Sequence, residues 1–402
     1  MPQRTLSADE AADRLGISKA TLYSYVSRGL IRSEEGAGKT RARRYVAADV
    51  EGLVRRKEQR RHPDRAAESA LHFGDPVLES AITLIDNGRL FYRGWDATEL
   101  ACTHSFEAVA SLLWGDSTAS GASFSTLELD DVSAQNMRAI QMQLQQWRHL
   151  APVERFQLAL PLAAATDLAA FNQSRDAVAQ TGVRILHMLT MVATDSLLTM
   201  PIAQHLQQAW APTTPAAAEL LNAALILCAD HELNISAFTA RCVASTGATP
   251  YGAVLAALAA LQGPKHGGST HQVTALLRDA GVDARAAVSE RLRRGEMIPG
   301  FGHPLYPQAD PRGRALLDMT AKQFPNAAIH STARAVAELV SANFDRQPNI
   351  DFALVILELA LGLPAGSALT IFALGRTAGW IGHIIEQYEA GRMIRPRARY
   401  VG

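Results

Sequence analysis

Cysteine and lysine are both scarce in this chain. Among 402 residues there are five lysines and three cysteines, Cys102, Cys228 and Cys242. The cysteines are odd in number and show no C-x-x-C spacing, which argues against a disulfide framework and against a cysteine-based zinc site. We therefore expect reduced thiols in a cytoplasmic protein.

Long apolar segments are also missing. The longest clean run, GAVLAALAAL at residues 252–261, is well short of the roughly 20 residues that span a bilayer. The first residues, MPQRTLSADEAAD, lack the apolar segment of a signal peptide. Hydrophobic residues make up 48% of the chain and charged residues 19%, as in ordinary globular proteins, so we expect no contact with membranes.

Charge is balanced over the whole chain but unevenly distributed. Residues 1–65 contain 15 Lys and Arg against 9 Asp and Glu, a net charge of +6, so the remainder carries −6. A basic segment ahead of an acidic body indicates contact with nucleic acid. The polar, proline-containing stretch RRHPDRAAES predicts a linker, so we place a domain boundary near residue 65.

The stretch LSADEAADRLGISKATLYSYVSRGLIR has the start and stop signals of two short helices. Ser7 and Glu10 fit a capping box, Gly16 ends the first helix, Ser18 caps the second and Gly29 ends it. Two short helices joined at a glycine form a helix-turn-helix, whose second helix can enter a major groove. Helical spacing predicts a buried stripe in the second helix, made of Leu22, Val26, Leu30 and Ile31.

The residues after these helices predict a wing. EEGAGKTRARRYV is rich in glycine and charge and ends in an aromatic, and AADVEGLVRRKEQRR predicts a third helix. Over residues 5–60 the pattern resembles the winged helix-turn-helix of the mercury-resistance-regulator and excisionase group. We expect DNA binding, with a protein-interaction module as the alternative. The candidate DNA-binding residues are Lys19, Thr21, Tyr25, Arg28, Arg41, Arg43 and Arg44.

From about residue 66 onward the sequence is dominated by Ala, Leu and polar residues. Segments such as SFEAVASLLWGD and STARAVAELVSANF repeat apolar residues three and four positions apart, which is typical of amphipathic helices. We expect about fifteen helices and no convincing series of strands. No G-x-G-x-x-G follows a strand, so the body is predicted to be mainly α rather than a Rossmann fold.

Four polar segments interrupt this helical pattern. They are CADHELNISAFTARCVAST, GPKHGGSTHQV, IPGFGHPLYPQADPRG and QPNIDFALVILELALGLP. Taken singly, His266 can be a turn residue, Asp351 a helix N-cap and Arg312 an exposed residue at a helix start. Taken together, their histidines, carboxylate and arginines are the groups needed to join a thioester to a 2-oxo acid. The carboxylate would remove an α-proton, histidines would donate to the developing oxyanions, and arginines would hold carboxylates in bidentate geometry.

The body resembles citrate synthase over nearly all of residues 75–402. The motifs that carry the resemblance, in family order, are GRLFYRGWDATELA, ADHELNISAFTAR, GPKHGGSTHQV, PGFGHPLYPQADPR, PNIDF, FALGRTAGWIGHIIEQ and RMIRPRARYVG. The resemblance implies a mainly α citrate synthase fold behind the N-terminal domain. It implies a large domain at residues 66–264 and 351–402, and a small helical domain at 265–350 that closes over the bound 2-oxo acid.

The resemblance also implies roles for individual residues. His266 would be the general acid that hydrogen-bonds the thioester carbonyl, Asp351 the base, and His303 the group that polarises and protonates the ketone. The substrate-binding residues that it implies are His231, Arg312, Arg376 and Arg395. The last of these would reach the site of the partner subunit in a homodimer.

The implied reaction is condensation of acetyl-coenzyme A or propionyl-coenzyme A with oxaloacetate, followed by thioester hydrolysis to citrate or 2-methylcitrate. It requires no metal and no tightly bound cofactor, since the coenzyme A thioester is a substrate. The alternative is a DNA-binding regulator whose body senses a 2-oxo acid or an acyl-coenzyme A. The chain departs from the family at two places, of which the first favours the regulator and the second alters the hydrogen bonding after His266. Pro307 stands where many members have a Lys or Arg that contacts coenzyme A, and HGGSTHQ replaces the common H-G-G-A-N-E.

Overall fold

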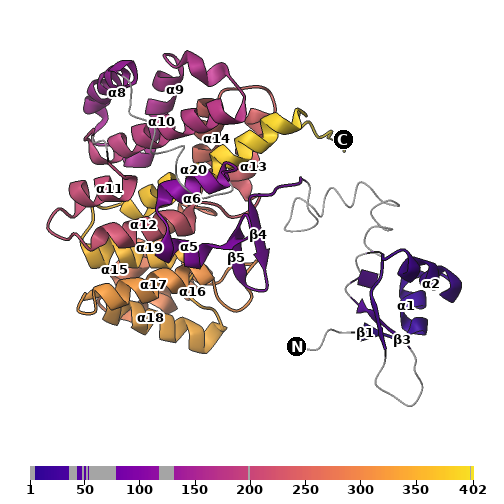
Figure 1. Cartoon of the computed structure of the whole chain (residues 1–402). Coiled ribbons are helices and arrows are strands. Elements are labelled where there is room, and N and C mark those ends of the chain that lie inside the picture. The colour runs from indigo at the N-terminus through magenta and orange to yellow at the C-terminus, as the bar shows by residue number, and fades with distance from the viewer. Residues whose placement is uncertain are drawn as a thin grey trace. The chain divides into compact units, whose positions relative to one another are not determined.

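The computed structural model describes residues 5–35, 43–47, 49–50, 53, 78–116, 131–197, 200–398 and 400–402. The chain forms two compact units, Met1–Glu79 and Ser80–Gly402, which we call the head and the body (Figure 1). The predicted boundary at residue 65 lies outside the described residues.

The head combines two helices with a three-stranded antiparallel sheet of order β1-β3-β2. Its elements are β1 (Thr5–Leu6), α1 (Ala8–Leu15), α2 (Lys19–Ser27), β2 (Ser33–Glu35) and β3 (Arg43–Val46). β2 and β3 pair directly and lie where the wing was predicted. Most of the predicted third helix, and Arg41 between the two strands, lie outside the described residues.

The helix boundaries in the head follow the predicted capping residues. Ser7 Oγ accepts a hydrogen bond from the Glu10 amide at 3.2 Å, and the Glu10 carboxylate accepts one from the Ser7 amide at 2.7 Å. Gly16 ends α1 in the left-handed conformation, with φ of 59°. Ser18 Oγ accepts from the Thr21 amide at 3.2 Å and caps α2. These contacts confirm the helix-turn-helix.

Two predictions about the head's second helix are wrong. Leu30 is 39% exposed, because α2 ends at Ser27 and the helical spacing no longer applies three residues later. Tyr25, predicted among the DNA-binding residues and hence on the outer face of the helix, is half-buried and packs against the head's core. That core consists of Ala11, Ala12, Leu15, Leu22, Ile31, Tyr45 and Val50.

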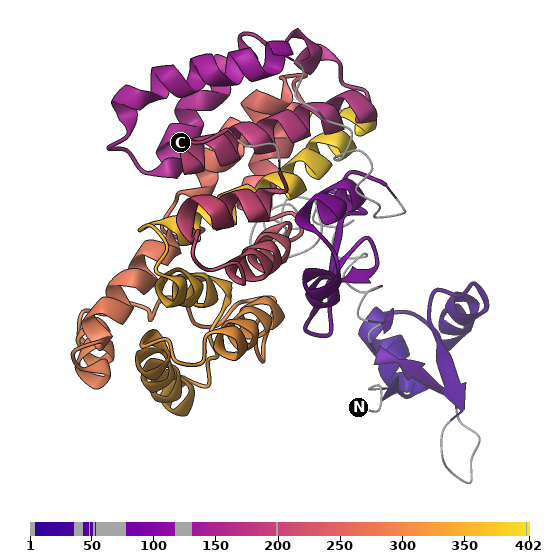
Figure 2. The same ribbon diagram turned by 60° about the vertical axis from the view of Figure 1, so that its left-hand side comes forward.

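Fifteen α-helices lie within the described residues of the body, as predicted. The first eight are α5 (Ala97–Thr103), α6 (Phe106–Leu113), α8 (Asp131–Leu144), α9 (Pro152–Ala164), α10 (Arg175–Thr194), α11 (Ile202–Trp210), α12 (Ala217–Cys228) and α13 (Ile235–Ala244). The other seven are α14 (Pro250–Leu261), α15 (Ser269–Ala280), α16 (Ala284–Arg293), α17 (Pro311–Gln323), α18 (Ile329–Phe344), α19 (Ile350–Leu361) and α20 (Ser367–Ala390). Two short 3-10 helices, Gln145–Trp147 and Leu168–Phe171, complete the set. In two views, α15 to α18 gather at one end of the body (Figures 1 and 2).

The body also contains a small antiparallel sheet, which contradicts the expectation of no strand series there. Its strands are β4 (Thr83–Asp86), β5 (Arg89–Tyr92) and β6 (Trp95–Asp96). Asn87 and Gly88, both with positive φ (50° and 75°), form the tight turn between β4 and β5. Strands of two to four residues are too short to show a recognisable alternation of apolar and polar residues.

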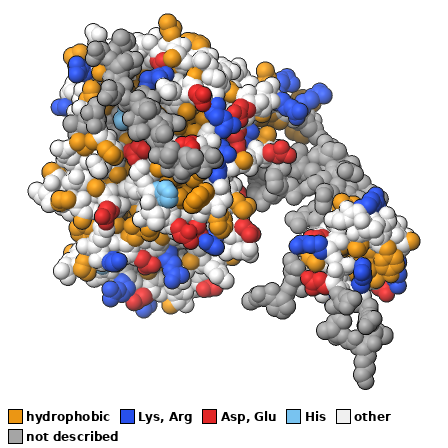
Figure 3. Space-filling view, viewed as in Figure 1, with side chains coloured by type: hydrophobic (Ala, Val, Ile, Leu, Met, Phe, Trp, Pro, Cys, Tyr) orange, Lys and Arg blue, Asp and Glu red, His pale blue; other side chains and the backbone are white. Residues whose placement is uncertain are grey.

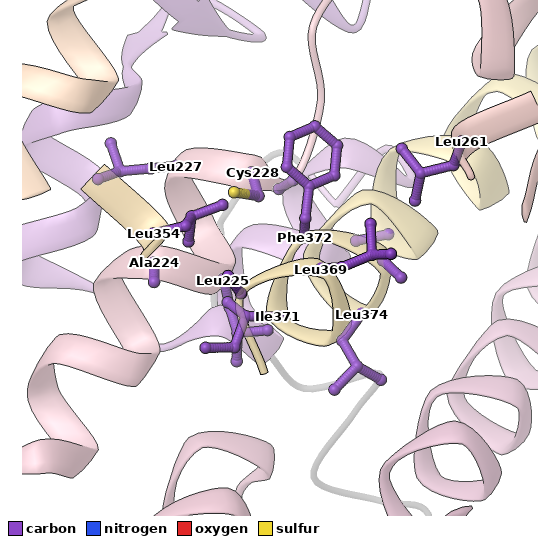
Figure 4. Packing of buried hydrophobic residues seen from close by; sticks show 14 of the residues in the cluster. Ala224, Leu225, Leu227, Cys228, Leu261, Leu354, Leu369, Ile371, Phe372 and Leu374 are labelled. Carbon is purple, nitrogen blue, oxygen red and sulfur yellow. The ribbon is translucent and has the colours of Figure 1, made fainter. Parts of the chain in front are cut away.

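Helix α20 is the central helix of the body and is almost entirely buried. By length and composition it is apolar enough to cross a membrane, but its apolar window is 100% buried among the surrounding helices. Glycines bring α20 against α12: a Cβ on Gly375 would lie 2.5 Å from Leu225 O, and one on Gly379 would lie 2.3 Å from Ala229 O. Figure 4 shows Ile371 of α20 beside Leu225 and Phe372 beside Cys228, while Leu374 leaves the helix in another direction. This close contact fixes the chain just before His231.

Candidate active site

His231 lies in the turn after α12 and is buried. Its Nε2 atom is 3.0 Å from the Tyr306 hydroxyl, and its ring meets the His303 ring edge-on with centroids 4.8 Å apart. Burial, followed by the charge of Arg312, holds the pKa of His231 well below its ordinary value. The imidazole is therefore neutral near pH 7.

His303 lies on the loop between α16 and α17. Its Nδ1 accepts a hydrogen bond from the Leu305 amide at 3.2 Å, which places the proton of a neutral ring on Nε2. Burial and the nearby charge of Arg312 lower the pKa of His303 to about 4. His303 is thus a neutral imidazole with one N–H to donate, as polarisation of a ketone requires.

Arg312 is buried, not exposed at a helix start. Its Nε and Nη2 atoms donate to the two oxygens of Asp310 at 2.9 and 2.8 Å. Burial opposes ionisation of Asp310, but the charge of Arg312 and the hydrogen bonds from Arg312 and the Ile350 amide together outweigh it and lower the pKa of that carboxyl. Asp310 also caps α17 and accepts from the Ile350 amide at 3.1 Å, so it links the starts of α17 and α19.

His266 lies between α14 and α15 and is half-buried. Its Nε2 atom is 2.9 Å from Ser236 Oγ, which also receives a hydrogen bond from Trp380 Nε1 at 3.1 Å. Burial and then the Arg376 charge lower the pKa of His266 to about 3, so this ring too is neutral near pH 7. As a hydrogen-bond donor it would act through the N–H of an uncharged imidazole.

Asp351 lies in the first turn of α19 but does not cap the helix. The cap is Asn349, whose Oδ1 accepts from the Asp351 and Phe352 amides at 3.0 and 3.3 Å. The carboxylate of Asp351 is left for other contacts, and its Oδ2 accepts from Ser269 Oγ at 2.5 Å. Burial raises the pKa of Asp351 to about 6, which makes it a stronger base than an ordinary aspartate.

Arg376 projects from α20 into the same buried region. Its Nε donates to the Cys228 carbonyl at 2.7 Å, and its guanidinium lies 4.7 Å from the Phe372 ring centroid. The Nη2 atom is buried and has no hydrogen-bond partner among the described residues. A buried, unpaired guanidinium nitrogen is costly unless an anion joins it, so the nitrogen marks a place for a carboxylate.

Six of the seven predicted catalytic and substrate-binding residues therefore lie in one buried region. His231 is close enough to His266, His303, Arg312 and Arg376 for their charges to affect its pKa. The charges of Arg312 and Arg376 likewise act on Asp351 and lower its pKa, against the larger effect of burial. The seventh residue, Arg395, lies on the exposed segment after α20 and makes no hydrogen bond or ion pair with the rest of the described chain.

The sequence reasoning missed Tyr306, Ser236, Asp310 and Ser269, which hold the histidines, Arg312 and Asp351. Tyr306 stands three residues after His303 and contacts both His303 and His231, with ring centroids 5.2 and 5.5 Å away. Its place in the polar segment H-P-L-Y was the available signal. Nowhere in the described chain do three or more His, Cys, Asp or Glu side chains gather as a metal site would need.

In the head, several predicted DNA-binding cations already have partners. Lys19 forms an ion pair with Asp9 at 2.5 Å, and Arg44 donates to Thr5 Oγ1 and O at 3.3 and 3.1 Å. Arg28 donates to the Ser24 carbonyl and stacks over Tyr25, 5.1 Å from its centroid. Lys and Arg lie beside Asp and Glu on the visible described surface of the head (Figure 3). Arg43 is exposed and Thr21 half-buried.

Comparison with known proteins agrees with both parts of this architecture. A family model of the citrate synthase C-terminal domain matches residues 73–397, and a helix-turn-helix domain model matches residues 5–58. Citrate synthase from Haloferax volcanii is 30% identical over 358 residues, which cover 81% of this chain and 93% of that protein. The crystal structure of citrate synthase from Thermotoga maritima superposes with a TM-score of 0.67 at 26% identity, covering 82% of this chain and 94% of that one.

Two further relatives match a shorter part of the chain. Citrate synthase 2 from Bacillus subtilis is 38% identical over 195 residues, 47% of this chain and 52% of the relative. A 2-methylcitrate synthase from Shewanella oneidensis is 34% identical over 189 residues, 46% and 50% of the two chains. In both matches the chain spans about half the length of the relative.

Fold, site and relatives together define a citrate synthase-type enzyme body that follows a small helix-turn-helix domain. The chain belongs to the citrate synthase family.

Proposed function

We propose that the body condenses an acyl-coenzyme A with oxaloacetate and then hydrolyses the thioester. The observation that carries this proposal is the buried Nη2 of Arg376, which has no hydrogen-bond partner in the described part of the chain and lies close to three neutral histidines. A small dicarboxylic 2-oxo acid suits this arrangement: Arg376 and Arg312 attract its carboxylates, and His303 Nε2–H donates to its ketone oxygen.

The proposed steps use the histidines as neutral rings and Asp351 as the ionised base, in line with the directions of their pKa shifts. Asp351 takes a proton from the α-carbon of the acyl group while His266 donates an N–H hydrogen bond to the thioester oxygen, giving an enolate whose oxygen is held by that hydrogen bond. The α-carbon then attacks the ketone carbon and the new C–C bond forms. The ketone oxygen takes a proton from His303, which regains one from solvent, and protonated Asp351 gives its proton back to solvent. Hydrolysis of the C–S bond releases coenzyme A. Stabilising the enolate oxygen supplies much of the rate, since a thioester α-proton is too weakly acidic for a carboxylate alone.

Thiol release from acetyl- and propionyl-coenzyme A with oxaloacetate tests this proposal and selects the donor. Relatives named citrate synthase and 2-methylcitrate synthase support both donors, so both need to be assayed. Release with one donor or both supports the proposal, and the preferred donor distinguishes citrate from 2-methylcitrate as product. No release with either donor, from folded protein, would refute it.

We further propose a homodimer in which Arg395 completes the partner's site, and a small domain at residues 265–350. The exposed position of Arg395 and its lack of contacts within the described chain support the first part. The grouping of α15 to α18 at one end of the body supports the second.

We expect a cytoplasmic enzyme that needs no metal and no tightly bound cofactor. Mixing Arg395→Ala chains with Asp351→Asn chains tests the shared site, because only mixed dimers would regain one intact site.

For the head we propose DNA binding of the mercury-resistance-regulator or excisionase type. The helix-turn-helix match and the strand pair at the predicted wing support it. If the head binds DNA, a second candidate function for the whole chain is a regulator whose body senses a 2-oxo acid or an acyl-coenzyme A. A gel shift with the chain's own upstream DNA tests both. Phosphate contacts require binding to weaken as salt rises, and sensing requires the shift to change when oxaloacetate or acyl-coenzyme A is added.

A further inference from the structure

Ser269 makes two contacts that join the two halves of the proposed acid–base pair. Its hydroxyl donates to Asp351 Oδ2 at 2.5 Å, and its backbone amide donates to the His266 carbonyl at 3.0 Å. It is the first residue of α15, while Asp351 lies in the first turn of α19. One residue therefore connects the loop that carries the acid with the helix that carries the base.

The hydroxyl contact leaves only one oxygen of Asp351 for chemistry. An O–H···O⁻ bond of about 2.5–2.7 Å is typical of a charge-assisted hydrogen bond to a carboxylate. With Oδ2 engaged, Oδ1 has no hydrogen-bond partner among the described residues. The contact therefore determines which oxygen can take the proton from the substrate.

We propose that Ser269 is a positioning residue for the base: it holds Asp351 in its ionised form and turns Oδ1 toward the acyl carbon. This inference rests on the proposed condensation, because it assigns the direction of the same carboxylate. It also explains the residue at this position, where the resemblance to the family led us to expect alanine. Alanine has no hydroxyl and leaves both oxygens of the carboxylate free to turn.

Other charges also act on Asp351 and remain when Ser269 is changed. They come from Arg312 in the first turn of α17, Asp310 at its N-cap and Arg376 of α20. The nearby Cys228 thiol of α12 adds no charge, because burial raises its pKa to about 12. From α18, which also packs against α19, the buried side chains are the apolar Ala333, Val336 and Val340, while Arg334 and Glu338 are exposed. Removing the Ser269 hydroxyl therefore changes only its own contribution to the pKa of Asp351, while the contributions of the other groups stay the same.

The test compares the full chain with Ser269→Ala, Ser269→Thr and Ser331→Ala. Ser331 is exposed at the start of α18, where its Oγ donates to the Ala328 carbonyl at 2.9 Å, so its replacement is a matched control. The first readout is the titration midpoint of the Asp351 carboxyl by carbon NMR of aspartate-labelled protein, with Asp351→Asn assigning the signal. The second is the acidic limb of the kcat–pH profile.

A donor to a carboxylate favours the charged form, so its loss raises the pKa of Asp351. We expect Ser269→Ala to move both midpoints up by about one pH unit, equivalent to about tenfold lower kcat on the acidic limb. Oxaloacetate KM should stay within about twofold, Ser269→Thr should restore the midpoints, and Ser331→Ala should leave them unchanged. An unchanged NMR midpoint in folded Ser269→Ala would overturn the inference. Absence of thiol release by the wild-type chain would instead refute the condensation, while the NMR midpoint still decides the Ser269 contact.

Discussion

The side chain of Ser236 lies 2.9 Å from His266 Nε2 and 2.7 Å from Asn234 Oδ1, with a single proton to share between them. If the hydroxyl donates to Asn234, His266 must carry its own proton on Nε2. If His266 is to donate from Nδ1 to a thioester, Nε2 becomes an acceptor and Ser236 must turn its proton toward it. The tautomer of His266 is thus coupled to the rotation of one hydroxyl.

Replacing Ser236 with alanine should therefore slow the chemistry rather than weaken 2-oxo acid binding. We expect kcat to fall about 10- to 100-fold with little change in oxaloacetate KM, as for loss of a hydrogen bond that orients a catalytic group. Steady-state thiol release measures both constants. Ser111→Ala is the matched control, since Ser111 is equally buried but its Oγ has no partner among the described residues. Equal losses in both variants would contradict this role.

Replacing Asp351 with asparagine should remove turnover and also stabilise the fold at neutral pH. We expect kcat to fall by at least about a thousandfold, because the amide cannot take a proton. The pKa of Asp351 is raised in the folded state, so its favourable contribution is complete below the unfolded pKa and is lost as pH rises through about 6. The variant's Tm should therefore exceed that of the wild type at pH 8 and approach it at pH 4. Calorimetry at both pH values checks this, and oxaloacetate binding should persist.

The kcat of the wild-type chain should fall on the acidic side only, as Asp351 becomes protonated below its pKa of about 6. Asp351 must be ionised to act as a base, so kcat should fall about tenfold per unit below its pKa of about 6. His266 and His303, with pKa values lowered to about 3 and 4, stay neutral throughout this range. The profile should therefore be flat from about pH 7 to 8.5. A second, histidine-like limb between pH 6 and 8 would show that one of these rings is charged at work.

The contact between α12 and α20 should tolerate no side chain at Gly379. A Cβ there would lie 2.3 Å from Ala229 O and 2.4 Å from Asp230 Oδ1, and the backbone cannot move without displacing His231. We expect Gly379→Ala to cost about 3 kcal/mol or more and to raise oxaloacetate KM. Gly252→Ala, in helix α14 with only the Ala248 Cβ at 3.9 Å, should instead stabilise by about 0.5–1 kcal/mol. Urea unfolding of the two variants makes the comparison.

The sequence predicted those features that depend on local spacing or on motif order. Helix content, the caps at Ser7 and Ser18, and the polar segments that carry His266, His303 and Asp351 were all readable in this way. The β4–β6 sheet was not, because its strands are too short to carry a periodic signal. The environment of Leu30 was wrong because helical spacing was extended past the end of α2.

Contacts between distant side chains were also beyond the sequence. Nothing in the order of residues shows that Ser269 meets Asp351 82 positions later, or that Tyr306 meets His231 across 75 positions. Such pairs depend on how helices pack, and packing is set by shape over the whole core rather than by any one segment. For the same reason the Asn349 cap, which frees Asp351, was not distinguishable from a cap by Asp351 itself.

The two contacts of Asp310 limit how the helices that carry the site can move relative to each other. Its carboxylate accepts a hydrogen bond from Arg312 at the start of α17 and another from the Ile350 amide at the start of α19. One buried carboxylate, that of Asp310, thereby links the arginine proposed to hold the 2-oxo acid to the helix that carries the carboxylate proposed to remove the proton. If α15 to α18 move relative to α19, the two contacts of Asp310 keep the starts of α17 and α19, and with them Arg312 and Asp351, at a constant distance from each other.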